Sequence, residues 1–180
     1  MVYLNRIYTK SGDNGETFLA NNTRIPKSDP ILNAVGEIDE ANCAIGLIYS
    51  LRNIGGMETT LHRIQNDMFN IGAQVAGSTT LKITEKSINF LEETIDYYND
   101  DMPPLESFIL PGGSKISALC HNARAVVRRA ERAVWALTEG DTTICAKYLN
   151  RLSDLLFVIA RLYNEDEILW KPGEEYDQTD

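Results

Sequence analysis

The sequence predicts an all-α protein: a five-helix up-and-down bundle preceded by a non-helical N-terminal arm. Apolar residues recur at intervals of three and four along five separate segments, which is the period of one face of an α-helix. The connections between these segments are short, as in bundles whose neighbouring helices run antiparallel. The first 29 residues lack this period and are rich in glycine and polar turn residues instead.

Length and composition are those of one globular domain. The chain has 180 residues, of which 43% are hydrophobic, and this is enough for a sizeable core. We expect a single domain over 1–180, with the arm at 1–29, the helical bundle at 30–166 and an acidic tail, disordered or loosely docked, at 167–180. The formal net charge of −9 argues against nucleic acid as a partner, so an anionic ligand would need a local basic cluster.

The cysteines and the N-terminus are typical of a cytoplasmic protein. Cys43, Cys120 and Cys145 are widely spaced within helical patterns, which favours buried reduced thiols over a disulfide framework or a zinc site. The N-terminus lacks the apolar run of a signal peptide, and no apolar stretch reaches the length of a membrane span. We therefore expect a cytoplasmic protein without a membrane partner.

The arm carries a glycine-rich loop, IYTKSGDNGET, at residues 7–17. Asp13, Asn14 and the two glycines mark a tight turn, and Lys10 lies among hydroxyl side chains. Such a loop can offer backbone N–H groups to an anion, although it lacks the spacing of a Walker A loop. A flexible surface arm or a hairpin turn would explain the same residues, and Lys27 nearby has the same ambiguity.

Capping residues and chain breakers place the five helices. Proline follows Ser28 and Asp29 at the first helix, and the segment NDDMPPLESFILPGGS interrupts the pattern before the fourth. The expected helices run from Pro30 to a unit end at Gly55-Gly56, from Met57 to Ala76, from Thr84 to Tyr98, from Ser117 through Leu137 to an end at Gly140, and from a cap at Asp141 or Thr142 to Tyr163.

Four further positions need an explanation. Asp39 lies beside the apolar stripe of the first helix, so it is either a surface residue or the partner of an arginine on the fourth helix. Phe108 belongs to an apolar triplet within a loop, and most such triplets plug a core. Asn150 and Asp154 share one face of the fifth helix.

The fourth helix has two unlike faces. At about 100° per residue, Arg124, Arg128 and Glu131 fall together opposite the apolar stripe, whereas Arg129 points more than about 90° away. A solvated face would explain these charges, because surface ion pairs are common and contribute little. Trp135 lies almost in line with the charges, however, and a large aromatic is poorly placed for full exposure.

Four segments give the chain a specific resemblance. They are IYTKSGDNGET, AVGEIDEANCAIG, HNARAVVRRAER and YLNRLSDLLFVIAR, which follow one another in this order over nearly the whole chain. Together they resemble the PduO-type family of ATP:cob(I)alamin (corrinoid) adenosyltransferases. The resemblance implies transfer of the 5′-deoxyadenosyl group of ATP to the Co(I) centre of cobalamin or another corrinoid, with release of triphosphate. It also implies a homotrimer with sites between subunits, and Mg2+ accompanying the nucleotide.

The same resemblance assigns roles to individual residues. From one subunit, the arm would bind the ATP phosphates through Thr9, Lys10, Ser11, Gly12, Thr17 and Lys27. From its neighbour, the ATP site would be completed by Arg128, Glu131, Arg132 and Asn150. Asp39 and Arg124 would form an interface ion pair, and Phe108 would line the corrinoid face; with Arg128, these residues would carry catalysis. Glu16 adds a negative charge near the expected phosphates, and His121 is a candidate wall residue.

The residues also fit this chemistry on physical grounds. Since the nucleophile is the metal of the substrate, the protein needs no nucleophile or general base of its own. It must hold an anionic leaving group and present C5′ to cobalt, which is positioning and electrostatics. The alternative is a helical bundle that binds ATP as a nucleotide sensor or partner-binding module without turnover, although such a protein would not need Phe108 and its Pro-Gly-Gly loop.

Overall fold

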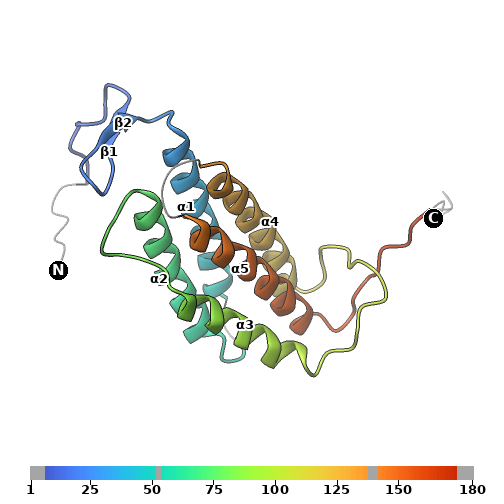
Figure 1. Ribbon diagram of the computed structural model, residues 1–180. Coiled ribbons are helices and arrows are strands. Elements are labelled where there is room, and N and C mark those ends of the chain that lie inside the picture. The colour runs from blue at the N-terminus through green and yellow to red at the C-terminus, as the bar shows by residue number, and fades with distance from the viewer. Residues whose placement is uncertain (1–6, 52–53, 138–141, 174–180) are drawn as a thin grey trace.

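The structure is a computed structural model that describes residues 7–51, 54–137 and 142–173 (Figure 1). Its elements in chain order are β1 (Glu16–Phe18), β2 (Arg24–Pro26), α1 (Pro30–Tyr49), α2 (Glu58–Val75), α3 (Glu85–Asn99), α4 (Lys115–Trp135) and α5 (Thr143–Leu162). The five predicted helices are confirmed. In the described part of the chain, the only sheet is the two-stranded pair of β1 and β2.

Side-chain caps begin two helices close to where the sequence places them. Asp29 Oδ1 accepts a hydrogen bond from the backbone N–H of Ile31 at 2.9 Å, directly before the proline that begins α1. Ser114 Oγ accepts from the N–H of Ser117 at 3.1 Å and caps α4. Each bond satisfies a backbone donor that has no partner within its own helix. Of the two candidate caps of α1, Asp29 is therefore the one used.

The C-terminal end of α4 comes earlier than the sequence predicts. The helix ends at Trp135, and the N–H of Leu137 bonds to the carbonyl three residues before it, which is a tighter turn than the α-helical ladder. The predicted end at Gly140 is therefore wrong. Gly140 itself and the candidate cap Asp141 lie outside the described residues, while Thr142 holds the capping position of α5 without a side-chain hydrogen bond.

The helix α4 packs against both α1 and α5, while α2 packs against α1 and α3 packs against α5. On α4 the stripe that faces its neighbours consists of buried small or β-branched residues: Ala123, Val127, Ala130 and Val134. Small side chains allow close approach of helices, and a fully buried larger aliphatic contributes about 1.5–3 kcal/mol. This buried stripe fixes the rotation of α4, and therefore the direction of its opposite, charged face.

The arm folds as a hairpin. β1 pairs with β2 in antiparallel fashion, with Thr17 opposite Ile25. Leu19 is buried at the turn, and the N–H of Ala20 donates to the carbonyl of Ala76 at 3.0 Å, which ties the hairpin to the end of α2. Of the two structural interpretations of the arm, the hairpin is the observed one, and it lies beside the N-terminal end of α1 (Figure 1).

The expectation of buried thiols holds for Cys120 and Cys145 but is wrong for Cys43, which is exposed. Cys43 lies on α1 between Asn42 and Ala44, which occupy inward positions, so its own side chain points outward. Across the described ranges, no helix combines the length and the apolar character needed to span a membrane.

A buried polar contact between α5 and α2 gives a test of the packing. The hydroxyl of Tyr148, a residue with no exposed surface, donates to Asp67 Oδ2 at 3.2 Å. Burial raises the pKa of Asp67, while the Tyr148 hydrogen bond and the charge of Arg63 lower it. Tyr148→Phe removes the donor from a half-buried carboxylate and should lower the free energy of unfolding by about 1–3 kcal/mol at pH 7.

Urea unfolding monitored by circular dichroism measures this loss. The deficit should shrink as the pH falls through the Asp67 pKa, because a protonated Asp67 no longer requires the donor. The exposed Tyr97 provides the matched control, since Tyr97→Phe removes a hydroxyl that lies in solvent. Equal unfolding midpoints for the two variants would contradict a stabilising Tyr148–Asp67 bond.

Candidate functional site

The glycine-rich loop of the arm contains residues with positive φ, a backbone conformation that favours glycine. Lys10 and Gly15 have φ values of +61° and +80°, and the loop is closed by hydrogen bonds from Asp13 N–H to the Lys10 carbonyl and from Gly15 N–H to the Gly12 carbonyl. Turns of this kind direct successive backbone N–H groups to one side, as an anion-binding loop requires.

Lys27 lies against this loop. Its backbone N–H donates to the Gly15 carbonyl at 2.8 Å, and its Nζ is so near Gly12 that a Cβ built there would lie 3.0 Å away. The Thr9 and Ser11 hydroxyls form a hydrogen bond of 2.8 Å in the same loop. The structure therefore brings together the phosphate-binding candidates of the arm.

Glu16 points to a different partner. Its carboxylate forms an ion pair with Arg24 Nε at 3.0 Å, across the two strands of the hairpin. Cross-strand pairs of opposite charge stabilise a hairpin modestly. The negative charge that the sequence places near the loop is therefore balanced within the hairpin.

A groove of about 620 Å³ lies where the hairpin meets α1 and α2. Its polar side chains include Thr17, Lys27, Asp39 and Asn42, and its apolar lining includes Leu32, Val35, Ile38, Met68 and Phe69. A mostly apolar hollow with a few polar groups is the usual form of a small-molecule site. Three predicted site residues, from the hairpin and α1, therefore share this groove.

Asn42 adds a polar atom that the sequence analysis did not assign to the site. Its Nδ2 donates to the Gln65 carbonyl at 3.3 Å, but its Oδ1 is buried and has no hydrogen-bond partner in the described part of the chain. A buried acceptor without a partner is costly. In the sequence, the position of Asn42 beside the apolar stripe of α1 was the only indication that this side chain could belong to the site.

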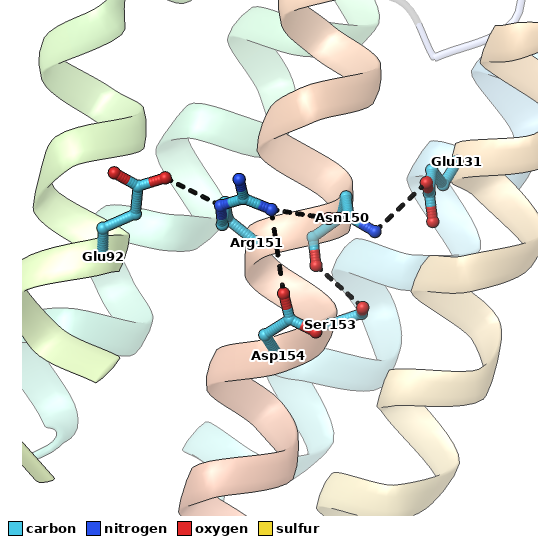
Figure 2. A network of polar contacts seen from close by, with 6 residues as sticks. All are labelled: Glu92, Glu131, Asn150, Arg151, Ser153 and Asp154. Atoms are coloured by element: carbon cyan, nitrogen blue, oxygen red, sulfur yellow. Dashed lines mark hydrogen bonds and ion pairs between the residues drawn. The ribbon is translucent and has the colours of Figure 1, made fainter. Parts of the chain in front are cut away.

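The second group of site residues lies on α4 and α5 (Figure 2). Asn150 Nδ2 donates to Glu131 Oε1 at 3.4 Å, and Arg151 Nη1 donates to Asn150 Oδ1 at 2.7 Å. Arg151 is held in turn by Glu92 of α3, at 2.7 Å, and lies 3.9 Å from Asp154. These contacts fix both the nitrogen and the oxygen of the Asn150 amide. The part of Arg151 in holding Asn150 could not be predicted from sequence spacing.

The cationic part of this face is poorly satisfied. Arg124 Nε is buried and without a hydrogen-bond partner among the described residues. Burial lowers the pKa of Arg124, and the neighbouring Arg128 charge lowers it further. Arg128 is itself exposed, and its backbone carbonyl accepts from Arg132 Nη1 at 3.0 Å. Two adjacent guanidinium groups, one with a buried free donor, form a site suited to an anion.

Arg129 belongs to a different surface, as its position on the helical wheel predicts. It forms ion pairs with Glu37 and Glu40 of α1. It therefore ties α4 to α1, while Arg128 remains free of carboxylates within hydrogen-bonding distance in the described structure. Trp135, at the end of the charged face, is 54% exposed and therefore partly covered.

Phe108 lies in a third place, in the loop before α4. Its side chain is 77% exposed, and its ring centroid is 6.0 Å from that of Trp170. Ile109 is the member of the triplet that is buried. The interpretation of Phe108 as a core plug is therefore wrong, because alternate side chains of an extended segment point to opposite sides.

His121 lies one to two turns along α4 from this loop. It is 4% exposed, its ring packs on Phe157, and its Nδ1 has no hydrogen-bond partner among the described residues. Burial lowers the pKa of His121, and the charge of Arg124 lowers it further, whereas Glu167 acts in the opposite direction. The other histidine, His62, is exposed.

The groove and the charged face do not complete each other within one chain. In the described residues, no ion pair joins Asp39 of the groove to Arg124 of the charged face. Lys10 and Lys27 lie on the hairpin side, whereas Arg124 and Arg128 lie on α4. Each surface carries part of the predicted ATP site.

Known proteins resemble this chain over most of its length. The cobalamin adenosyltransferase family model matches residues 7–163. A corrinoid adenosyltransferase from Mycobacterium bovis is 46% identical over 185 residues, covering 96% of each chain, and one from Bacillus subtilis is 42% identical over 88% of this chain and 86% of that protein.

A solved structure extends the similarity to the fold. It is a variant PduO-type ATP:corrinoid adenosyltransferase from Lactobacillus reuteri, complexed with cobalamin and ATP. Its TM-score to this structure is 0.87 at 32% sequence identity, covering 93% of this chain and 97% of that chain. On the matched family model, the near-full-length relatives and the shared fold, the chain belongs to the cobalamin adenosyltransferase family.

Proposed function

We propose that the groove of one subunit and the charged α4–α5 face of another together form the active site of this chain, which is an ATP:corrinoid adenosyltransferase. The observation that carries the proposal is that each surface holds buried polar atoms without partners: Asn42 Oδ1 in the groove and Arg124 Nε on the charged face. Because such atoms are costly to leave unpaired, both surfaces are suited to being covered.

The reaction transfers the 5′-deoxyadenosyl group of ATP to the Co(I) centre of the corrinoid substrate. A Co–C5′ bond forms with an electron pair from cobalt, the C5′–O bond breaks, and triphosphate leaves with that bonding pair. The nucleophile belongs to the substrate, so the protein contributes positioning and electrostatic stabilisation of the leaving group. The assignments below follow from this requirement.

In the proposed site, the arm binds the phosphates. Backbone N–H groups of the loop around Gly12, with the hydroxyls of Thr9, Ser11 and Thr17, donate to phosphate oxygens. Lys10 and Lys27 add positive charge; the closeness of Lys27 Nζ to Gly12 supports their acting at one place. The interactions strengthen as negative charge develops on the departing triphosphate.

The neighbouring subunit supplies the arginines. Arg128 binds phosphate with a planar fork that can contact two oxygens, and Arg132 adds charge beside it. Glu131 and Asn150, already joined by a hydrogen bond, bind the remainder of the nucleotide. Asp39 of the first subunit pairs with Arg124 of the second, which would satisfy an arginine that has a free buried Nε in a lone chain.

Mg2+ would accompany the nucleotide. In the described ranges, no group of three or more His, Cys, Asp or Glu side chains could hold a metal ion. This fits an ion bound mainly by the phosphates and water, as is usual for Mg2+ with nucleotides. When bound, the ion would neutralise part of the leaving-group charge.

The corrinoid is proposed to bind at Phe108. An exposed aromatic ring at a loop beside α4 provides an apolar surface for the lower face of the corrin ring. There it would exclude water and the lower axial ligand and leave cobalt four-coordinate, which makes Co(II) easier to reduce. We further propose a cytoplasmic homotrimer in which 1–180 form one domain: the arm at 1–29, the bundle at 30–166 and the tail at 167–180.

The direct test combines the protein, Mg-ATP and chemically reduced cobalamin. Absorbance spectroscopy should record formation of adenosylcobalamin, with triphosphate as the second product. ATP binding without turnover would instead support the nucleotide-sensor alternative.

The intersubunit site predicts complementation between two inactive variants. Lys27→Ala damages the arm side and Arg128→Ala damages the α4 side, so each homotrimer should lose most of its activity. When the two are dissociated, mixed equally and reassembled, about one quarter of the interfaces should combine an intact arm with an intact α4 face. Activity should therefore return to about one quarter of that of wild type treated identically.

A control pair shares one surface. Lys10→Ala mixed with Lys27→Ala leaves every interface with a damaged arm, so its activity should not return. Failure of the first pair to recover, with subunit exchange verified by mass spectrometry, would place both residues in one subunit's site. Analytical ultracentrifugation of the wild type tests the trimer.

Phe108 should affect the corrinoid and leave ATP binding unchanged. Phe108→Ala removes an exposed ring, so the trimer should fold normally and bind ATP with near-wild-type affinity. Transfer starting from Co(II) should slow by about tenfold or more, with less of the four-coordinate spectral species. Phe69→Ala, which truncates an exposed ring in the groove, is the comparison that should leave the four-coordinate signal intact. Loss of ATP binding in Phe108→Ala would contradict the assignment.

A further inference from the structure

Arg161, near the C-terminal end of α5, is a buried charged residue that the site described above does not use. Its side chain is 6% exposed, and among the described residues it is the only Asp, Glu, Lys or Arg that is buried. Taking a guanidinium out of water costs several kcal/mol unless its donors are paired. The partners of Arg161 are therefore the reason it can occupy this position.

Those partners come from two segments far apart in the sequence. Arg161 Nε donates to Glu167 Oε1 at 2.8 Å, and Nη2 donates to Glu167 Oε2 at 3.4 Å. The same Nη2 donates to the backbone carbonyl of Pro103 at 2.9 Å. One planar side chain thus ties to α5 both the loop before α4 and the segment after α5. A lysine, with a single compact charge, could not reproduce this fork.

The two segments held by Arg161 also pair with each other. The N–H of Trp170 donates to the carbonyl of Phe108 at 2.7 Å, and the N–H of Leu110 donates to the carbonyl of Ile168 at 2.8 Å. Ser107 Oγ donates to the carbonyl of Trp170 at 2.8 Å. The residues of this antiparallel contact, 107–110 and 168–170, are called here the loop pair.

The loop pair needs support from elsewhere. It is a single isolated bridge with mostly exposed side chains, and two short strands alone are at best marginally stable in water. Packing of Gly113 on Asn164, where an added Cβ would collide with the side-chain amide, brings the same two segments close at a second point. The buried ion pair of Arg161 with Glu167 attaches this region to the helical bundle.

We propose that Arg161 is a positioning residue of the active site, which fixes the loop pair on α5 and thereby sets the place of the Phe108 ring. The proposal rests on the corrinoid role of Phe108 for its functional consequence. Arg161 itself touches no reacting atom: its side chain is covered by Pro103 and Glu167, and it acts through the backbone to which the aromatic ring is attached.

The structural half of the proposal has a readout that does not depend on activity. The chain has two tryptophans, so Trp135→Phe leaves Trp170, in the loop pair, as the only one. In this background, Arg161→Lys and Glu167→Gln should raise acrylamide quenching of Trp170 fluorescence about twofold, because the loop pair separates from α5 more often. Arg63→Lys, which alters another arginine–carboxylate pair on α2, is the matched control and should leave quenching unchanged.

The functional half is measured in the chain that retains Trp135. Arg161→Lys and Glu167→Gln should slow transfer starting from Co(II) by about tenfold and weaken the four-coordinate signal, with the KM for ATP unchanged. The attachment of the loop pair to α5 by Arg161 and Glu167 is called here the clamp. Glu167→Gln keeps the size of the side chain and most of its hydrogen-bonding shape, so it tests the clamp even where an arginine substitution fails to fold.

The outcomes separate the clamp from the assignment of Phe108. Unchanged Trp170 quenching in both variants would overturn the clamp. Increased quenching with normal Co(II) kinetics, while Phe108→Ala is slow, would also overturn it, because the ring would be placed without the clamp. A general fall in ATP binding and thermal stability would show a merely structural role and overturn the positioning proposal. If Phe108→Ala itself were normal, the proposed corrinoid role would fail, and quenching alone would decide the clamp.

Discussion

The rest of the structure depends on a cationic face of α4 that its own chain does not neutralise. The opposite stripe of the helix is buried against its neighbours, so α4 cannot turn to hide the arginines. Arg124 Nε is buried beside the charge of Arg128 and has no hydrogen-bond partner in residues 7–51, 54–137 and 142–173. Such a face is suited to an anion or a carboxylate that pairs with the buried donor. Because the net charge of the chain is −9, its overall field repels large polyanions, whereas this local cluster of positive charge can still bind a small anionic ligand.

The fold divides the proposed active site between two surfaces for a physical reason. A loop that wraps phosphates needs glycine-type backbone conformations, which a helix cannot provide, so it lies on the hairpin. Side chains that grip the nucleotide from the other side need a rigid base, and α4 and α5 provide it. Bringing these two surfaces together across an interface leaves each part on the element that suits it, with Asp39 and Arg124 as the complementary charges.

The sequence predicted what depends on periodicity and local capping. Helix positions and the separation of Arg128 from Arg129 followed from spacing, whereas the shared groove of Thr17, Lys27 and Asp39 is seen only in the structure. The end of α4 and the exposure of Cys43 were missed, because a tight turn and neighbouring inward positions decide them. Contacts between irregular segments, such as those of Arg161, follow no period, so the sequence alone held no signal for the clamp.

Two positions on α5, Asn150 and Arg161, link the proposed sites of the two substrates. Asn150 accepts a hydrogen bond from Arg151 and donates one to Glu131 of α4. Arg161 holds the loop that carries Phe108 through the carbonyl of Pro103. Eleven residues separate Asn150 from Arg161, which is about 16 Å along a helix. Because a packed helix hardly changes its length, rigid structure would set the positions of ATP and corrinoid relative to each other in the proposed site. An SN2-type transfer between two large substrates requires this, since misplacement of C5′ by about 1 Å can cost about a hundredfold in rate. In the proposed site, Arg151 and Arg161 of α5 would therefore help to set where the reacting atoms meet without touching them.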